Sequence, residues 1–368
     1  MAKIWLVSSY FLLLVLFSFS TGTMKLTQAS TVSSIFIFGD STADVGTNNN
    51  LEVAFVARAN YPHNGIDFSS YGLPTGRFSN GRNTADYLAK LIGLRRSPAP
   101  FHALLGRKGS LNRHVIRGAN FASGGSGILL LTGSQFGKVV PLDAQIIQFA
   151  TVRGNFTKYL GSSRKTDTFL SKSLFFISVG SNDIFEYVHS NKNPNKEKFL
   201  TGIVSTYQSQ LRDLHKLGAR KFGIVSTPLI GCCPSQRSLN ATGGCLDISN
   251  EYSLTFYSMM GKMLIELSCE LKEMKYSFAN AYEMVANIMD NPIPYGFKNI
   301  TSACCGGGRF NGDSPCIETA EVCRNRSEYL FWDWYHPTQA ASDLAAVTLY
   351  DGPPRFVTPI NFRQLAEH

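Results

Sequence analysis

The sequence lacks the features that mark several classes of protein. It carries 35 Lys and Arg against 26 Asp and Glu, but these cations are scattered and form no basic run with interleaved aromatics. Nucleic-acid binding is therefore unsupported, and a mildly basic, solvated surface is the simpler interpretation. The sequence also lacks CxxC pairs and histidines at ligand spacing, which argues against a metal site. It has no internal repeat and no low-complexity linker that would divide it.

The first 29 residues differ from the rest. The stretch from Ile4 to Phe19 is apolar, and Thr27-Gln28-Ala29 supplies small residues where a signal peptidase cleaves. We predict that residues 1–29 are a signal peptide and that residues 30–368 form one domain of a secreted, extracellular protein. The alternative is an N-terminal membrane anchor, which is disfavoured because the run falls short of the ~20 residues that span a bilayer. No second apolar segment of that kind follows.

Cysteine is absent from the first 231 residues, and all eight copies lie beyond them. Their even number, two adjacent pairs and Gly- and Pro-rich surroundings favour disulfides in an oxidising compartment, with connectivity open. Cys269 lies in an apolar helical stretch and suits an unpaired core thiol. The cysteines are Cys232, Cys233, Cys245, Cys269, Cys304, Cys305, Cys316 and Cys323. Four N-glycosylation sequons, individually weak signals, agree with export: Asn155, Asn240, Asn299 and Asn325.

Short apolar runs alternate with longer amphipathic segments, the pattern of a parallel sheet flanked by helices. The predicted class is therefore α/β. The predicted helices are Lys196–Leu217, stopped by Gly218, and Ser249–Met274. The predicted strands are Ile35–Phe38, His114–Phe121, Leu174–Val179, Lys221–Ser226 and Tyr276–Ala279. Two Gly- and Asn-rich segments, 48–83 and 232–247, are predicted to be long loops over one rim of the sheet.

Reactive side chains directly after strands are of first interest, because ligands of open α/β sheets bind beyond the carboxyl ends of the strands. Ser41 follows the first strand at a turn, where its hydroxyl would be exposed and nearby backbone N–H groups could face an anion. The context is not the GxSxG elbow of the α/β-hydrolases, because position 43 is Ala. Taken alone, Ser41 is equally compatible with a helix N-cap.

Two further segments offer hydrogen-bond donors. The Gly-rich loop after the second strand, residues 118–127, lets the backbone approach a substrate, although such a segment is often only a turn. Asn182 follows the clearest strand, and its amide is a neutral donor of the kind that stabilises a tetrahedral intermediate. Its alternative is an Asx-turn.

Asp333 and His336 are three residues apart before a predicted helix that runs to about Tyr350, with Pro337 suited to the first helical position. This spacing lets a carboxylate accept from one imidazole nitrogen while the other takes a proton from a hydroxyl. The alternative is a helix-capping turn with a surface histidine. The four segments occur in chain order at strand or helix boundaries on one rim, which favours a common site.

These residues resemble the plant GDSL esterase/lipase family of the SGNH hydrolase superfamily. The motif blocks are FGDSTADVGTNNN, NFASGGSGI, GSND and DWYHPT, with PLIGCCP and CCGGG as supporting features. The resemblance covers essentially the whole mature chain and implies a three-layer α/β/α sandwich with a five-stranded, flavodoxin-like parallel sheet. Thr42, in place of Leu, and Thr47, in place of Gly, depart from the pattern and affect loop shape rather than chemistry.

By this resemblance Ser41 is the nucleophile, His336 the general base and Asp333 its orienting carboxylate. The oxyanion hole would combine the Ser41 N–H, the Asn182 amide and one glycine N–H, for which we choose Gly124, with Gly125 a close competitor. The implied activity is hydrolysis of a lipid, cutin-like, acetylated-glycan or small phenolic ester, with no metal or organic cofactor. The alternatives are acyl transfer to a sugar or polymer hydroxyl and a non-catalytic binding protein.

The sequence leaves two possible roles for one apolar run. Residues Ile128–Leu131 suit either the lining of an acyl site or plain core.

Overall fold

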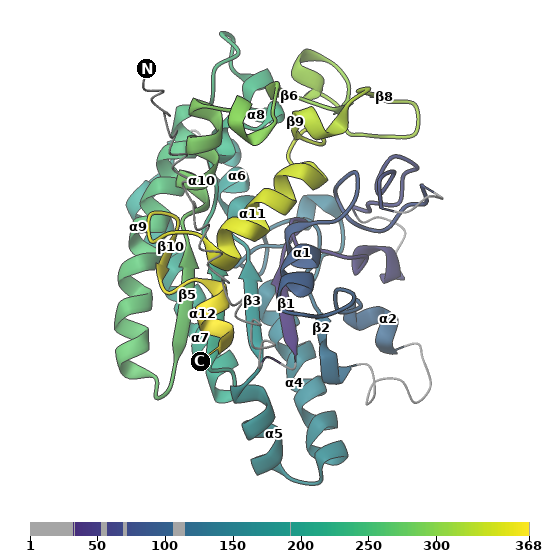
Figure 1. Cartoon of the computed structure of the whole chain (residues 1–368). Coiled ribbons are helices and arrows are strands. Elements are labelled where there is room, and N and C mark those ends of the chain that lie inside the picture. The colour runs from purple at the N-terminus through teal and green to yellow at the C-terminus, as the bar shows by residue number, and fades with distance from the viewer. Residues whose placement is uncertain are drawn as a thin grey trace, which may run out of the picture.

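The computed structural model describes residues 32, 34–52, 57–68, 72–105, 115–191 and 193–367; the predicted signal peptide lies outside them. The described chain is built around a six-stranded sheet in the order β10-β5-β4-β3-β1-β2 (Figure 1). Its strands are β1 (Ile35–Gly39), β2 (Gly118–Asn120), β3 (Leu174–Ser178), β4 (Lys221–Val225), β5 (Lys275–Ala279) and β10 (Val357–Pro359).

Five of these strands are parallel, and β10 pairs antiparallel with β5 at the edge. The order β2-β1-β3-β4-β5 is that of a flavodoxin-like sheet, so the predicted α/β class and five-stranded parallel sheet are confirmed. The sixth strand was not predicted, because its three residues end in Pro359 and carry no strand pattern of their own.

Helices cover both faces of the sheet, which gives three layers (Figure 1). The α-helices are α1 (Thr84–Leu91), α2 (Phe101–Leu105), α4 (Leu142–Leu160), α5 (Ser163–Ser171), α6 (Ser181–Ser190), α7 (Lys196–Lys216), α8 (Pro234–Leu239), α9 (Asp247–Glu270), α10 (Ala281–Asp290), α11 (Gln339–Asp351) and α12 (Phe362–Glu367). Within the described residues, none of the helices is both long and apolar enough to cross a membrane.

The two faces have separate cores because successive strand residues point to opposite sides. Phe36, Phe38 and Phe175 face α4, α7 and α9, and their rings pack edge-on against Phe149 of α4. On the opposite face, side chains of β1 and β3 pack against α1, α10, α11 and α12. Phe176 belongs to this second core.

Most predicted elements lie within a few residues of the observed ones. The helix predicted over Lys196–Leu217 is α7, and Gly218 follows it with φ +105°, as a C-terminal glycine should. The helix predicted over Ser249–Met274 is α9, which starts two residues earlier and ends four residues earlier.

The strand predicted over His114–Phe121 is only partly correct. Val115–Arg117 form a 3-10 turn, and the strand itself is limited to Gly118–Asn120. His114 lies outside the described residues. Gly118 explains the late start, because its φ of +111° and its close approach to the Ile35 carbonyl admit no side chain.

The cysteine-rich segment forms two small sheets beside the main one. They pair β6 (Asn299–Ala303) with β9 (Tyr329–Phe331), and β7 (Cys305–Gly306) with β8 (Glu321–Val322). The predicted disulfides are present as Cys232–Cys245, Cys304–Cys323 and Cys305–Cys316. Cys269 is unpaired as expected, but it is exposed on α9 rather than in the core; the buried free thiol is Cys233.

Several 3-10 turns complete the described chain. They are η1 (Asn48–Asn50), η2 (Val115–Arg117), η3 (Ser134–Phe136), η4 (Ile230–Cys232), η5 (Ile293–Tyr295), η6 (Arg309–Asn311) and η7 (Arg326–Glu328). The segment predicted as a loop over residues 232–247 also contains the short helix α8.

Candidate active site

Ser41 lies at the carboxyl end of β1, in a turn rather than at a helix N-terminus. The turn is fixed by the N–H of Ala43, which donates to the Asp40 carbonyl at 3.2 Å, and by the hydroxyl of Thr42, which donates to the Asp40 carboxylate at 2.8 Å. Gly39 precedes it with φ +142°, where a Cβ would lie 2.1 Å from the Ser178 carbonyl oxygen. The helix-cap alternative for Ser41 therefore does not describe this turn.

His336 contacts Ser41 across 295 residues of sequence, and Asp333 contacts the other side of the His336 ring. The His336 Nε2 lies 2.7 Å from the Ser41 Oγ, and its Nδ1 lies 2.8 and 2.9 Å from the two carboxylate oxygens of Asp333. Both residues are largely buried, with Asp333 5% and His336 8% exposed. With the carboxylate accepting from Nδ1–H, Nε2 is left free to accept the serine proton.

The Asp333 carboxylate also organises its own turn. Its Oδ1 accepts the backbone N–H groups of Tyr335 at 2.9 Å and His336 at 2.8 Å, while the Trp332 N–H donates to the His336 carbonyl at 2.7 Å. The capping-turn alternative is thus partly right, because the same carboxylate holds the turn and the imidazole. The helix begins later than predicted: Thr338, not Pro337, adjoins α11, whose first turn it caps through Ala341 N–H.

Asn182 and the Gly-rich loop lie beside the serine and line the same cavity. One N–H of the Asn182 amide donates to the Ser126 carbonyl at 2.9 Å, which fixes the side chain and leaves its second N–H for a ligand. The N–H of Gly124 is already donated to the Asp44 carboxylate at 3.0 Å. Gly125 lines the cavity, and no described residue accepts its N–H. Of the two glycines, the geometry therefore favours Gly125 over our first choice, Gly124.

Comparison with known proteins agrees with this geometry. A family model described as GDSL-like Lipase/Acylhydrolase matches residues 35–347. The chain belongs to this family.

Curated relatives cover nearly the whole chain. GDSL esterase/lipase At5g55050 from Arabidopsis thaliana is 36% identical over 346 residues, 92% of this chain and 91% of the relative. GDSL esterase/lipase At3g50400 from the same plant is 36% identical over 369 residues, 96% of this chain and 97% of the relative. The chain is therefore a member of a family of carboxylic ester hydrolases.

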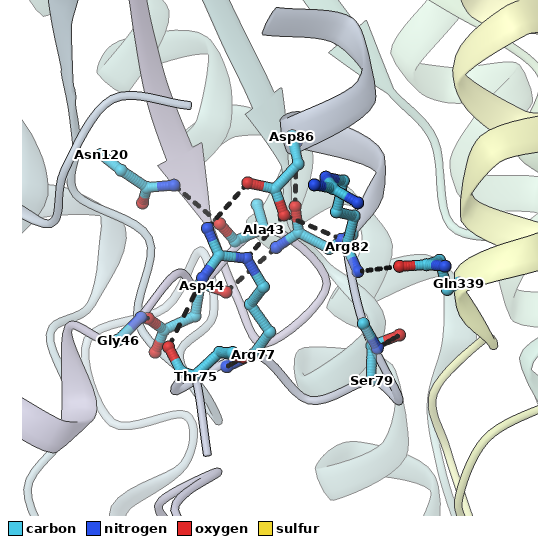
Figure 2. Close-up of polar contacts among 12 residues, drawn as sticks. Ala43, Asp44, Gly46, Thr75, Arg77, Ser79, Arg82, Asp86, Asn120 and Gln339 are labelled. Atoms are coloured by element: carbon cyan, nitrogen blue, oxygen red, sulfur yellow. Dashed lines mark hydrogen bonds and ion pairs between the residues drawn. The ribbon is translucent and has the colours of Figure 1, made fainter. Parts of the chain in front are cut away.

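Behind the serine of this GDSL family member, Asp44 holds the backbone in place. Its Oδ1 accepts the N–H groups of Gly46 at 2.7 Å and Thr47 at 2.6 Å, and its Oδ2 accepts that of Gly124. Figure 2 shows the carboxylate of Asp44 directed at Gly46, and the Asn120 amide directed at the Ala43 carbonyl. Burial raises the pKa of Asp44 to about 6, although these donors oppose the shift.

A buried ion pair supports this segment from the side of α1. The Arg77 guanidinium binds both oxygens of Asp86 at 2.6 and 2.7 Å (Figure 2). Asp86 in turn forms a capping box with Asn83 at the start of α1. The Asn83 amide donates to the Asp44 carbonyl at 3.0 Å. None of these supporting residues was singled out in the sequence. The sequence signal for Asn83 and Asp86 was the Asn-x-x-Asp capping box. That motif predicts where a helix starts, but it does not predict which other segment the start of the helix contacts.

A cavity of about 1020 Å³ opens around Ser41, Asp333 and His336. Part of its lining is polar and includes Arg58, Asn64 and Glu186; another part is formed by apolar side chains of α10 and α11. No group of three or more His, Cys, Asp or Glu side chains suited to a metal ion occurs in the described part of the chain.

The Ile128–Leu131 run matches neither of its two expected roles as a whole. Ile128 is fully buried in the core, whereas Leu130 and Leu131 are exposed at a turn.

Proposed function

We propose that this protein hydrolyses carboxylic esters through an acyl-enzyme formed on Ser41. His336 takes the serine proton as the hydroxyl attacks the ester carbonyl, and then gives that proton to the departing alcohol. Water, deprotonated by His336, next attacks the acyl-enzyme and releases the acid. The observation that carries the proposal is the continuous contact from Asp333 through His336 to the Ser41 Oγ.

The negative charge of each tetrahedral intermediate would be held by three N–H donors. We assign these to the backbone N–H of Ser41, the backbone N–H of Gly125 and the free N–H of Asn182. Asp333 stabilises the imidazolium that forms during both steps and keeps the ring in its productive orientation.

Replacement of Ser41 tests the proposal. S41A should lose hydrolysis of p-nitrophenyl acetate by at least about 10⁴-fold and should no longer react with a fluorophosphonate probe. A matched control is S258A, because Ser258 is an exposed serine of α9 that bonds only its own helix. If S41A hydrolyses the ester at the rate of S258A, Ser41 is not the nucleophile.

We also propose that the protein is exported, with residues 1–29 removed and residues 30–368 retained as one domain. The three disulfides support an oxidising compartment. The sequons at Asn155, Asn240, Asn299 and Asn325 are proposed glycosylation sites, and Asn325 is exposed. N-terminal sequencing of protein secreted from plant cells should begin at residue 30, and deglycosylation should lower its mass. Retention of residues 1–29 would overturn the processing prediction.

A further inference from the structure

The cavity continues from the triad across the second face of the sheet. The hydroxyl of Thr42, beside the nucleophile, lies 3.0 Å from that of Ser178, at the end of β3. Ser178 pairs in register with Val225 of β4, and Phe176 lies two residues earlier on the same face of β3. Val225 and Phe176 both line the cavity. The floor therefore passes from the nucleophile turn onto an apolar strip of the sheet.

Two helices form the walls above this floor. The cavity-lining residues of α10 include Ala281, Met284, Val285 and Ile288, and those of α11 include Ala341, Leu344, Ala345 and Thr348. Both sets follow the spacing i, i+3, i+4, i+7, so each is one continuous stripe of its helix. Two apolar stripes thus line one space. We call the space between α10, α11, Phe176 and Val225 the α10/α11 channel.

The channel offers few free groups for a polar ligand to bind. The one polar side chain in these two stripes is Thr348, and its hydroxyl already donates to the Leu344 carbonyl at 2.9 Å. Asn287 of α10 also lines the cavity, and its amide donates to the Tyr295 hydroxyl. A channel with few free donors or acceptors favours hydrocarbon over sugar, because a buried hydroxyl without a partner is costly. An acyl chain attached to Ser41 meets this requirement.

Phe356 bounds the channel away from the triad. It lies in the connection after α11, where its carbonyl accepts the Asn280 N–H at 2.8 Å at the start of α10. His336 precedes α11, so the helix leads from the catalytic histidine to this ring. From Ala341 to Leu349, the lined part of α11 is roughly 12 Å long at 1.5 Å per residue. Extended C–C bonds advance about 1.25 Å each, so this length holds about ten carbons.

The rest of the cavity has a mixed lining. Arg58, Asn64, Glu186 and His189 line it away from the two apolar stripes, together with aromatic side chains such as Phe78 and Phe185. These charged and hydrogen-bonding groups suit the hydrophilic alcohol of an ester, and they leave the apolar channel for the acid.

We infer that the α10/α11 channel is the acyl subsite and that this protein acts on esters of aliphatic acids of about ten carbons. This inference rests on the proposed function, because it concerns the acyl group transferred to Ser41. Phe356 sets the upper limit of chain length, and Val285 and Ala345, in the middle of the stripes, set the width.

A series of p-nitrophenyl esters from acetate to palmitate tests the inference on the full mature protein. The value of kcat/KM should rise about two- to four-fold per added methylene and fall beyond about ten carbons. V285F should lower the ratio of decanoate to acetate activity at least tenfold. The control V347F places the same substitution on the exposed face of α11, where Val347 is 51% exposed, and should keep the wild-type ratio.

Phe356→Ala should move the optimum toward longer chains. Titration with a fluorophosphonate gives the fraction of active sites in every variant, so a folding defect is separated from altered selectivity. A flat chain-length profile, or a V285F ratio equal to that of V347F, would overturn the acyl subsite while leaving the nucleophile assignment intact. If the proposed function itself were wrong, the wild-type protein would neither react with the fluorophosphonate nor hydrolyse p-nitrophenyl acetate. That result differs from failure of the acyl subsite alone, in which both reactions persist.

Discussion

The carboxylate of Asp44 accepts the backbone N–H of Gly124 at 3.0 Å and thereby joins the segment after β1 to the Gly-rich loop. The two residues are 80 positions apart in the sequence. Because the same carboxylate also accepts N–H groups of Gly46 and Thr47, one buried side chain sets the separation between Ser41 and the proposed oxyanion donor of Gly125. Asp44 is therefore a positioning residue, and its replacement should affect the chemical step.

Replacing Asp44 by Asn should lower kcat by about 10- to 100-fold with a small change in KM. The amide cannot accept from all of these donors, and the loss of a buried, charge-assisted hydrogen bond is worth roughly 1.5–3 kcal/mol. A trifluoroketone that forms a tetrahedral adduct should bind D44N more weakly in proportion to kcat, whereas a non-reactive ether analogue of the substrate should bind equally. Equal weakening of both ligands would indicate a general structural defect instead.

The same substitution should change how stability depends on pH. Burial raises the pKa of Asp44 to about 6 in the folded protein, above its value of about 3.9 in an unfolded chain, so the folded state binds this proton more tightly. The stabilisation is complete below about pH 4 and is lost as pH rises through 6. From pH 5 to 7.5 the wild type should lose about 1.4 kcal/mol relative to D44N. Urea unfolding of both proteins measures this difference.

If the difference in unfolding free energy between wild type and D44N is the same at pH 5 and pH 7.5, the proton on Asp44 is not linked to folding. D290N, which replaces an exposed carboxylate at the end of α10, serves as the control.

Replacing Asp333 by Asn should lower kcat by roughly 10³- to 10⁴-fold, because an amide can present a donor to the imidazole and favour the wrong tautomer. The Asp333 Oδ1 also holds the turn through two backbone N–H groups, so D333A should in addition lower the melting temperature. Steady-state kinetics with p-nitrophenyl acetate and a thermal melt measure the two effects. Activity of D333N within tenfold of wild type would show that the contact with His336 is not used in catalysis.

Removing the Asn182 side chain should cost about 10²- to 10³-fold in kcat, the usual loss for one oxyanion donor. The change should fall on kcat rather than KM, because the donor acts on the charge that develops in the transition state. N191A is the matched control, since Asn191 is an exposed asparagine just beyond α6. Equal kcat values for N182A and N191A would remove Asn182 from the oxyanion hole.

The sequence alone determined the α/β class, most strand and helix positions and four local segments with chemistry. Hydrophobic runs and Gly breaks are local signals, as is the three-residue spacing of Asp333 and His336. The sequence could not choose a glycine for the proposed oxyanion hole, because Gly124 and Gly125 are neighbours with the same chemistry. Only the fold distinguishes their N–H groups, because it brings the Asp44 carboxylate to that of Gly124.

Tertiary structure alone decided the contacts and the burial that no local pattern records. It decided which cysteines pair, and it decided that Cys269 is exposed while Cys233 is buried. It also brought Ser41 to His336 across 295 residues of sequence. The stripes of α10 and α11 were each readable as ordinary core faces. Their alignment around a channel that begins at Ser41 follows from how the two helices lie over the sheet, and no local pattern records that arrangement.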